Sequence, residues 1–213
     1  MHIPDGMLPG EVCLAGFAGT AALTWISVKQ AEKKYRDTSR VISRASVMAA
    51  AFFVASWIHI PLPPVSVHPI LAGLMGIVLG WLSFPAILVA LFFQAAMFGH
   101  GGFTTLGVNS LTMGGSALLA WGIFRAFPRG SGDKGVLQAG FLAGFAGVML
   151  AAAATSAILL LTIPSYVDPS IERAGILAMA GSHIPVALAE GVFTGLVARL
   201  LMRLNPGMLE QSG

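Results

Sequence analysis

Long apolar runs alternate with short polar segments along the whole chain. Seven runs predict membrane-crossing helices, at roughly 11–28, 44–60, 69–82, 84–98, 109–127, 136–163 and 183–203. A crossing needs about 20 mostly apolar residues, so the run at 69–82 is short for one. Because strand-like alternation is absent, the pattern favours helices over a β-barrel. We therefore expect an all-α integral membrane protein with seven transmembrane helices.

Composition supports a membrane protein and one domain. Hydrophobic residues make up 56% of the 213 residues and charged residues only 10%, and the mean hydropathy is +0.82. A soluble domain carries about 25% charged residues. We expect a single transmembrane domain over 1–213, with a leader at 1–10 and a polar cytoplasmic tail at 205–213.

Basic residues fall almost entirely on one side of the predicted helices. Of the 12 lysines and arginines, all except Arg173 follow the first, fifth or seventh apolar run or end it. Since basic loops stay in the cytoplasm, the N-terminus is expected outside and the C-terminus inside. The pI of about 9.4 then reflects orientation in a lipid bilayer, and no nucleic-acid partner is expected.

The same topology places every histidine at the outer end of the molecule. Histidine also favours membrane interfaces in general, which explains partial clustering better than complete clustering. The five residues are His2, His59, His68, His100 and His183.

The leader has the groups of a metal chelate. A free amine on Met1, the amide of His2 and Nδ1 of its ring would put three nitrogens nearly in one plane, which suits Ni(II) and Cu(II). The leader has no basic segment or cleavage site, so we expect no removable signal peptide and a retained amine. The alternative is a short polar leader before the first helix.

A fourth ligand would complete the chelate. His68 is the first choice because it follows a proline-rich outer loop that restricts the backbone, and neutral imidazole binds nickel, cobalt and copper. His100 is the alternative. The candidates for orienting the ligands through hydrogen bonds are Ser66, His100, Thr104 and Asn109.

Glu190 is a carboxylate inside the last apolar run, and His183 lies seven residues earlier on about the same helix face. The pair could relay a proton or brace the leader. The simpler interpretation is a buried carboxylate bonded to a neighbouring helix. An intramembrane metallo-hydrolase using both residues is a weaker alternative, because no nucleophile or zinc-protease signature accompanies them. No enzyme activity is expected.

The sequence contains no P-loop of the form G-x-x-x-x-G-K-[ST] and no paired acidic residues within its apolar runs. A metal carrier of this kind needs partner proteins that supply energy, or it works alone as a downhill permease.

Three blocks resemble the substrate-capture membrane subunits of nickel and cobalt energy-coupling-factor transporters, the CbiM/NikM family. They are Met1–Gly6, Val67–Gly76 and Phe98–Asn109, and they lie in the first half of the chain. Pro69 departs from the family pattern and disfavours helix at His68. The run from Trp81 to Leu88 looks more like the nickel members.

The resemblance implies seven transmembrane helices with the N-terminus inserted into the bundle, in a prokaryotic plasma membrane. It implies metal bound by the amine of Met1, the amide and ring of His2, and His68. Ni²⁺ is then the transported substrate, with Co²⁺ as the alternative, and no catalytic cofactor is expected. The implied partners are a small accessory membrane subunit, a transmembrane coupling subunit and two ATPase subunits.

Overall fold

The computed structural model describes residues 2–35, 38–62, 65–127, 132–165 and 167–211. Within them the chain forms helices α1 to α8, one 3₁₀ turn and one β-hairpin. Their bounds are α1 Gly10–Lys34, α2 Thr38–Ala55, β1 Ile60–Leu62, β2 Val65–Val67, α3 Ala72–Leu79, the 3₁₀ turn Gly80–Leu82, α4 Ser83–Phe98, α5 Leu106–Ala126, α6 Gly132–Leu161, α7 Pro169–Leu204 and α8 Pro206–Gln211.

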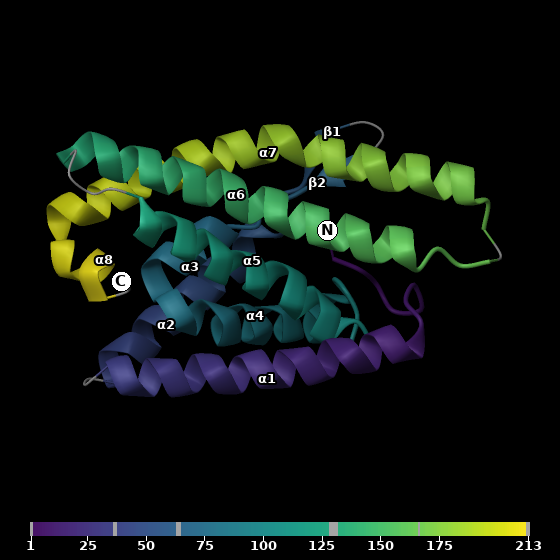
Figure 1. Ribbon diagram of the computed structural model, residues 1–213, viewed down its shortest axis with the longest axis horizontal. Helices are drawn as coiled ribbons and strands as arrows, with labels where there is room; N and C mark the ends of the chain where they lie inside the picture. The colour runs from purple at the N-terminus through teal and green to yellow at the C-terminus, as the bar shows by residue number, and fades with distance from the viewer. Residues whose placement is uncertain (1, 36–37, 63–64, 128–131, 166, 212–213) are drawn as a thin grey trace.

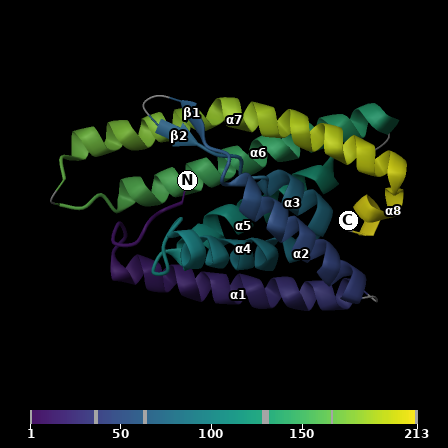
Figure 2. The ribbon, with the colours of Figure 1, turned by 180° about the vertical axis from the view of Figure 1, so that it is seen from behind.

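The helices form a bundle with short elements at its centre. Helices α6 and α7 run side by side along one edge, α1 runs along the opposite edge, and α3, α4 and α5 lie between them (Figures 1 and 2). A Cβ on Gly140 would lie 2.8 Å from the Cα of Gly195, so glycine lets α6 and α7 approach closely. Every residue of α3 is buried, which places this short helix in the core.

The predicted all-α membrane class is confirmed, but a count of seven crossings is not. Four segments are long and apolar enough to cross a membrane, Gly10–Lys34, Ala72–Phe98, Gly132–Leu161 and Pro169–Leu204, and Val41–Ala55 is a shorter apolar helix. This number refers to the described parts of the chain only.

Several predicted boundaries were wrong. The first helix extends to Lys34 and not only to 28, and the second is Thr38–Ala55 and not 44–60, so it ends before the strand that begins at Ile60. The run at 69–82 yields only the eight-residue α3, because Leu71 before it and Gly80 after it have φ angles of 53° and 55°. The last predicted crossing, at 183–203, is part of α7, which begins at Pro169 because Asp168 caps it by accepting a hydrogen bond from the Ser170 amide. The helix continues through Pro185.

The proline-rich loop contains a feature that the all-α prediction did not include. Strands β1 and β2 pair antiparallel, with Ile60 opposite Val67. The hairpin lies beside α7 on the face seen in Figure 2 and ends directly before His68. The histidine is therefore held next to a paired strand.

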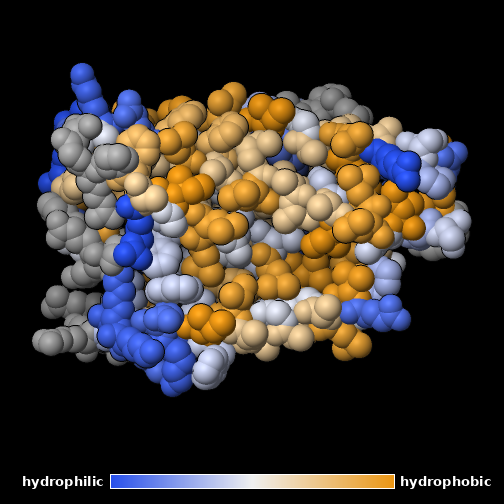
Figure 3. Space-filling model, in the orientation of Figure 1, coloured by the Kyte–Doolittle hydropathy of each residue, from blue (hydrophilic) through white to orange (hydrophobic). Residues whose placement is uncertain are grey.

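The surface shows how the protein sits in a membrane. A broad apolar band separates two hydrophilic ends (Figure 3). The end of α1, the start of α6 and the end of α7 share one hydrophilic end (Figure 1), with Lys33, Lys34 and Arg203 among their basic residues. This end is cytoplasmic by the positive-inside rule. The tail, expected to be merely polar, forms α8 and buries Leu209 in an apolar cluster with Ile77.

Candidate metal centre

The leader turns back from the start of α1 into the bundle (Figure 1). Ile3 is only 2% exposed and packs in an apolar cluster with Leu8, Cys13 and Val108. Burying such a side chain contributes about 1.5–3 kcal/mol. The neighbouring His2 is thereby carried into the interior.

Asn109 of α5 holds the main chain of Ile3 on both sides. Its Oδ1 accepts from the Ile3 amide at 3.0 Å, and its Nδ2 donates to the Ile3 carbonyl at 3.0 Å. The Thr105 hydroxyl donates to the same carbonyl at 2.6 Å. Asn109 was predicted to orient ligands, and it acts here through the backbone next to His2.

Asp5 fixes the leader to the glycine-rich loop before α5. Its carboxylate accepts from the amides of Phe103 and Thr104 at 3.1 and 2.8 Å, and from the Thr104 hydroxyl at 2.5 Å. These bonds, the hydroxyl's first, lower the pKa of Asp5. A Cβ on Gly102 would lie 2.2 Å from Asp5 Oδ1, so only glycine fits there.

The structure brings three of the predicted histidines together. Nδ1 of His2 lies 3.2 Å from Nε2 of His68, and the ring of His100 lies 4.1 Å from that of His2, centroid to centroid. One nitrogen from each ring lies within 4.8 Å of the others. His59 is exposed at the edge of the cluster, with its ring 6.2 Å from that of His68.

Hydrogen bonds determine which nitrogens carry protons. His2 Nε2 lies 2.9 Å from Gln94 Oε1, and the Gln94 amide donates to Ser56 Oγ at 2.7 Å, so His2 Nε2 is the donor. His68 Nδ1 lies 3.1 Å from the Pro69 carbonyl, which can only accept. The two nitrogens that face each other therefore both carry lone pairs.

Burial keeps these rings neutral. It is the main cause that lowers the pKa of His2 well below 6.5, and the neighbouring His68 and His100 lower it further. Burial likewise lowers the pKa of His68 to about 3, and it lowers the pKa of His100. Neutral imidazole is the form that binds metal.

Glu190 supports the loop that follows His68. Its carboxylate accepts from the amides of Ile70 and Leu71, the second at 2.8 Å. Leu71 is held with a positive φ, which is unfavourable for leucine. The carboxylate is buried, as the simpler interpretation predicted, but it bonds to the loop after His68 and not to a neighbouring helix or to the leader.

His183 does not join Glu190 in a reactive pair. Its Nδ1 donates to the Met179 carbonyl one turn earlier in α7, at 2.7 Å. Both acceptor atoms of Glu190 are instead bonded to main-chain amides. The arrangement offers no basis for the hydrolase alternative.

Two predicted residues cannot be placed. Met1 lies outside the described residues, and Ser66 lies where the side chains are not described. Thr104 orients the leader through Asp5 and does not contact a histidine ring in any described bond. Gln94 and Ser56 were missed, although a lone amide in the apolar run 84–98 was a usable signal.

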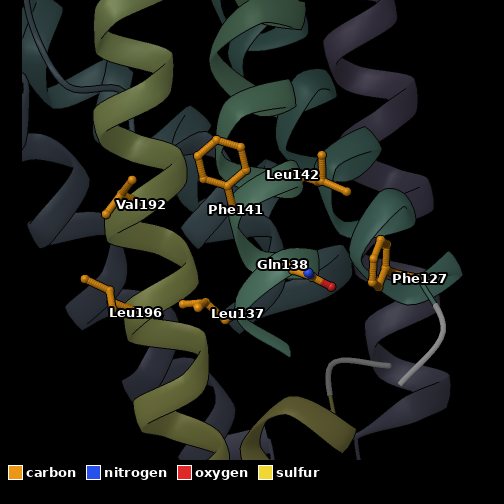
Figure 4. Close-up of a pocket in the computed structure, with 7 residues that line it drawn as sticks. All are labelled: Phe127, Leu137, Gln138, Phe141, Leu142, Val192 and Leu196. Carbon is orange, nitrogen blue, oxygen red and sulfur yellow. The ribbon is translucent and has the colours of Figure 1, made fainter. Parts of the chain in front are cut away.

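A cavity of about 570 Å³ lies away from the histidine cluster, between α6, α7 and the end of α5 (Figure 4). Its lining residues are Phe127, Leu137, Gln138, Phe141, Leu142, Val192 and Leu196. One amide among apolar groups offers poor ligands for a divalent cation. The histidine cluster is therefore the better candidate site.

Comparison with known proteins identifies the family of this chain. The family described as "Cobalt uptake substrate-specific transmembrane region" matches residues 2–208. The chain belongs to this CbiM family. The family consists of prokaryotic multi-pass membrane proteins for cobalt and nickel uptake, and its members are transport proteins, not enzymes.

Relatives in the family include transporters named for different metals. A "Putative metal transport protein" of Haemophilus influenzae is 34% identical over 100% of this chain and 98% of its own length. The "Cobalt transport protein CbiM" of Clostridium tetani is 30% identical over 100% of this chain and 89% of its own. The "Fused nickel transport protein NikMN" of Rhodobacter capsulatus is 31% identical over 98% and 64%.

Solved structures agree with the CbiM-family fold. A crystal structure described as a transition metal transporter superposes with a TM-score of 0.80 and 25% sequence identity, covering 97% of this chain and 94% of its own. A truncated transition metal transporter gives a TM-score of 0.79 at 26% identity, over 95% and 99%.

The clamp formed by Asp5 yields a first prediction. In Asp5→Asn one of the two acceptor oxygens becomes an NH₂ group, so the amides of Phe103 and Thr104, which bond to different oxygens, no longer both have an acceptor. We expect their hydrogen exchange to accelerate roughly threefold or more in detergent-solubilised protein, measured by mass spectrometry. Asp168→Asn is the matched control, because Asp168 caps α7 and does not contact the loop. Unchanged exchange at both amides in Asp5→Asn would contradict the clamp.

Proposed function

We propose that this chain captures Ni(II) at the outer face with four nitrogens. They are the Met1 amine, the His2 amide, His2 Nδ1 and His68 Nε2. The observation that carries the proposal is that His2 Nδ1 and His68 Nε2 lie 3.2 Å apart with their lone pairs facing each other. In a square-planar site with bonds of about 2.05 Å, neighbouring nitrogens lie about 2.9 Å apart. The metal-free arrangement needs little adjustment to reach this separation.

The donor set supports nickel over cobalt as the substrate. A plane of amine, amide and imidazole nitrogens suits Ni(II), which readily adopts square-planar geometry. The run from Trp81 to Leu88 resembles the nickel members of the family. Relatives named for cobalt and for nickel both match this chain, so Co(II) is the competing substrate to test.

Inward transport is proposed to depend on partner subunits. The chain belongs to a family of substrate-specific transmembrane components, and its sequence contains no P-loop. The proposed partners are a small accessory membrane subunit, a transmembrane coupling subunit and two ATPase subunits. A downhill permease acting alone is the alternative.

The ligand set is tested by changing each half of the site. Adding one residue before Met1 replaces its amine with an amide, and His68→Ala removes the fourth nitrogen. We expect the planar-nickel absorption band of the purified protein to disappear after the extension, and Ni(II) affinity to fall at least about tenfold in His68→Ala. His59→Ala, which removes a neighbouring exposed ring, is the control. Full binding in both test variants would refute the site.

The lowered histidine pKa values predict a particular pH dependence. Binding displaces one proton from the amine and one from the amide, so affinity falls as the pH falls. Because His2 and His68 stay neutral below their ordinary pKa of 6.5, they add no further protons. Between pH 6.5 and 5, log Kd should rise by about two for each unit of falling pH, measured by absorbance titration. A slope near four would mean that both imidazoles also titrate.

Dependence on partners is tested in sealed vesicles. The chain alone, with nickel outside and ATP inside, should give no accumulation. Adding the accessory membrane subunit, the coupling subunit and both ATPases of the same organism should give accumulation against the gradient, measured with radioactive nickel. Filling of vesicles to equilibrium by the chain alone would instead support the permease.

A further inference from the structure

A second cavity, of about 240 Å³, lies between the leader, α6 and α7 and reaches His2. Its wall includes Met7 of the leader, Thr155 of α6, and Glu172 and Met179 of α7. At about 30 Å³ per water, it has room for roughly eight waters. That exceeds the roughly six waters around a hydrated divalent cation of octahedral geometry.

Thr155 gives this cavity a polar wall that the fold itself does not use. The residue is 1% exposed, and among the described residues its hydroxyl has no hydrogen-bond partner. Buried hydroxyl groups are normally bonded to protein or to ordered water. The wall of the cavity therefore contains a buried polar group that the described part of the fold leaves unpaired.

Glu172 supplies a negative charge to the same wall. It stands in the first turn of α7, at the outer end of the bundle, and it is partly exposed. Within the described parts of the chain its carboxylate makes no hydrogen bond or ion pair, and the neighbouring Arg173 does not line the cavity. A negative charge at the wall of a cleft raises the local concentration of cations.

We propose that this cavity is the access vestibule through which a hydrated divalent cation reaches His2, and that Glu172 attracts the cation into it. The inference rests on the proposed capture of metal at His2 and adds the route. The site binds the hydrated cation weakly, through water, before the leader replaces those waters with nitrogen ligands. Glu172 thus governs the rate of capture, and the nitrogens govern the final complex.

The test is the rate of nickel association with the purified full chain, followed by rapid mixing with NiCl₂. Glu172→Gln should slow association about threefold or more at low ionic strength, and the difference should shrink in high salt. The spectrum of bound nickel should not change. Glu11→Gln is the matched control, because Glu11 lies in the first turn of α1 at the same end and does not line the cavity.

A filling variant tests the route without removing charge. Gly175 lines the cavity and a Cβ there meets no atom within 4 Å, so the backbone position accepts a side chain and Gly175→Leu adds bulk at the cavity wall. It should slow association, whereas Gly181→Leu, equally open and also in α7, should not.

The outcomes separate the route from the capture site. Wild-type association rates in both Glu172→Gln and Gly175→Leu, with normal binding, would overturn the vestibule alone. A wild-type chain that binds no nickel would overturn the proposed function and the vestibule together. Equal slowing by Glu11→Gln would show a general surface-charge effect and would also overturn the role of Glu172.

Discussion

The pairing of Asn109 with the main chain of Ile3 is the constraint on which the candidate site depends. A buried leader without strand or helix partners would leave its amide and carbonyl groups unpaired, at a cost of about 1–3 kcal/mol each. One carboxamide satisfies both groups of Ile3, and Thr105 adds a second bond to the carbonyl. With that backbone fixed, the ring of His2 has few positions left, and Gln94 selects among them.

The same logic of full hydrogen bonding makes the site suitable for a metal. Gln94 and the Pro69 carbonyl use the outward nitrogens of His2 and His68. The inward nitrogens, Nδ1 of His2 and Nε2 of His68, face each other across 3.2 Å, and neither carries a proton. Neutral rings in this orientation repel each other slightly, and a cation placed between them removes that repulsion.

The sequence predicted the chemistry better than the geometry. Charge asymmetry was sufficient to place all five histidines at the outer end, because a topology with one basic end leaves few arrangements, but it did not separate His2, His68 and His100 from the other two. The side chains that position the site were not predictable. Gln94 bonds to His2, which lies 92 positions away in the sequence, and Glu190 bonds to the loop after His68, about 120 positions away. The short α3 was also missed, because the apolar run at 69–82 does not reveal the positive φ angles at Leu71 and Gly80.

The positions of Asn109 and Glu190 have a mechanical consequence. The His2 half of the site is fastened to α5 by Asn109, and the loop after His68 is fastened to α7 by Glu190. The two candidate ligands are therefore held by different helices. A shift of α7 relative to α5 would move the two nitrogens apart, because each follows the helix that holds it. Such a site can open by movement of the helices that hold the two histidines, without unfolding of the leader or of the loop after His68.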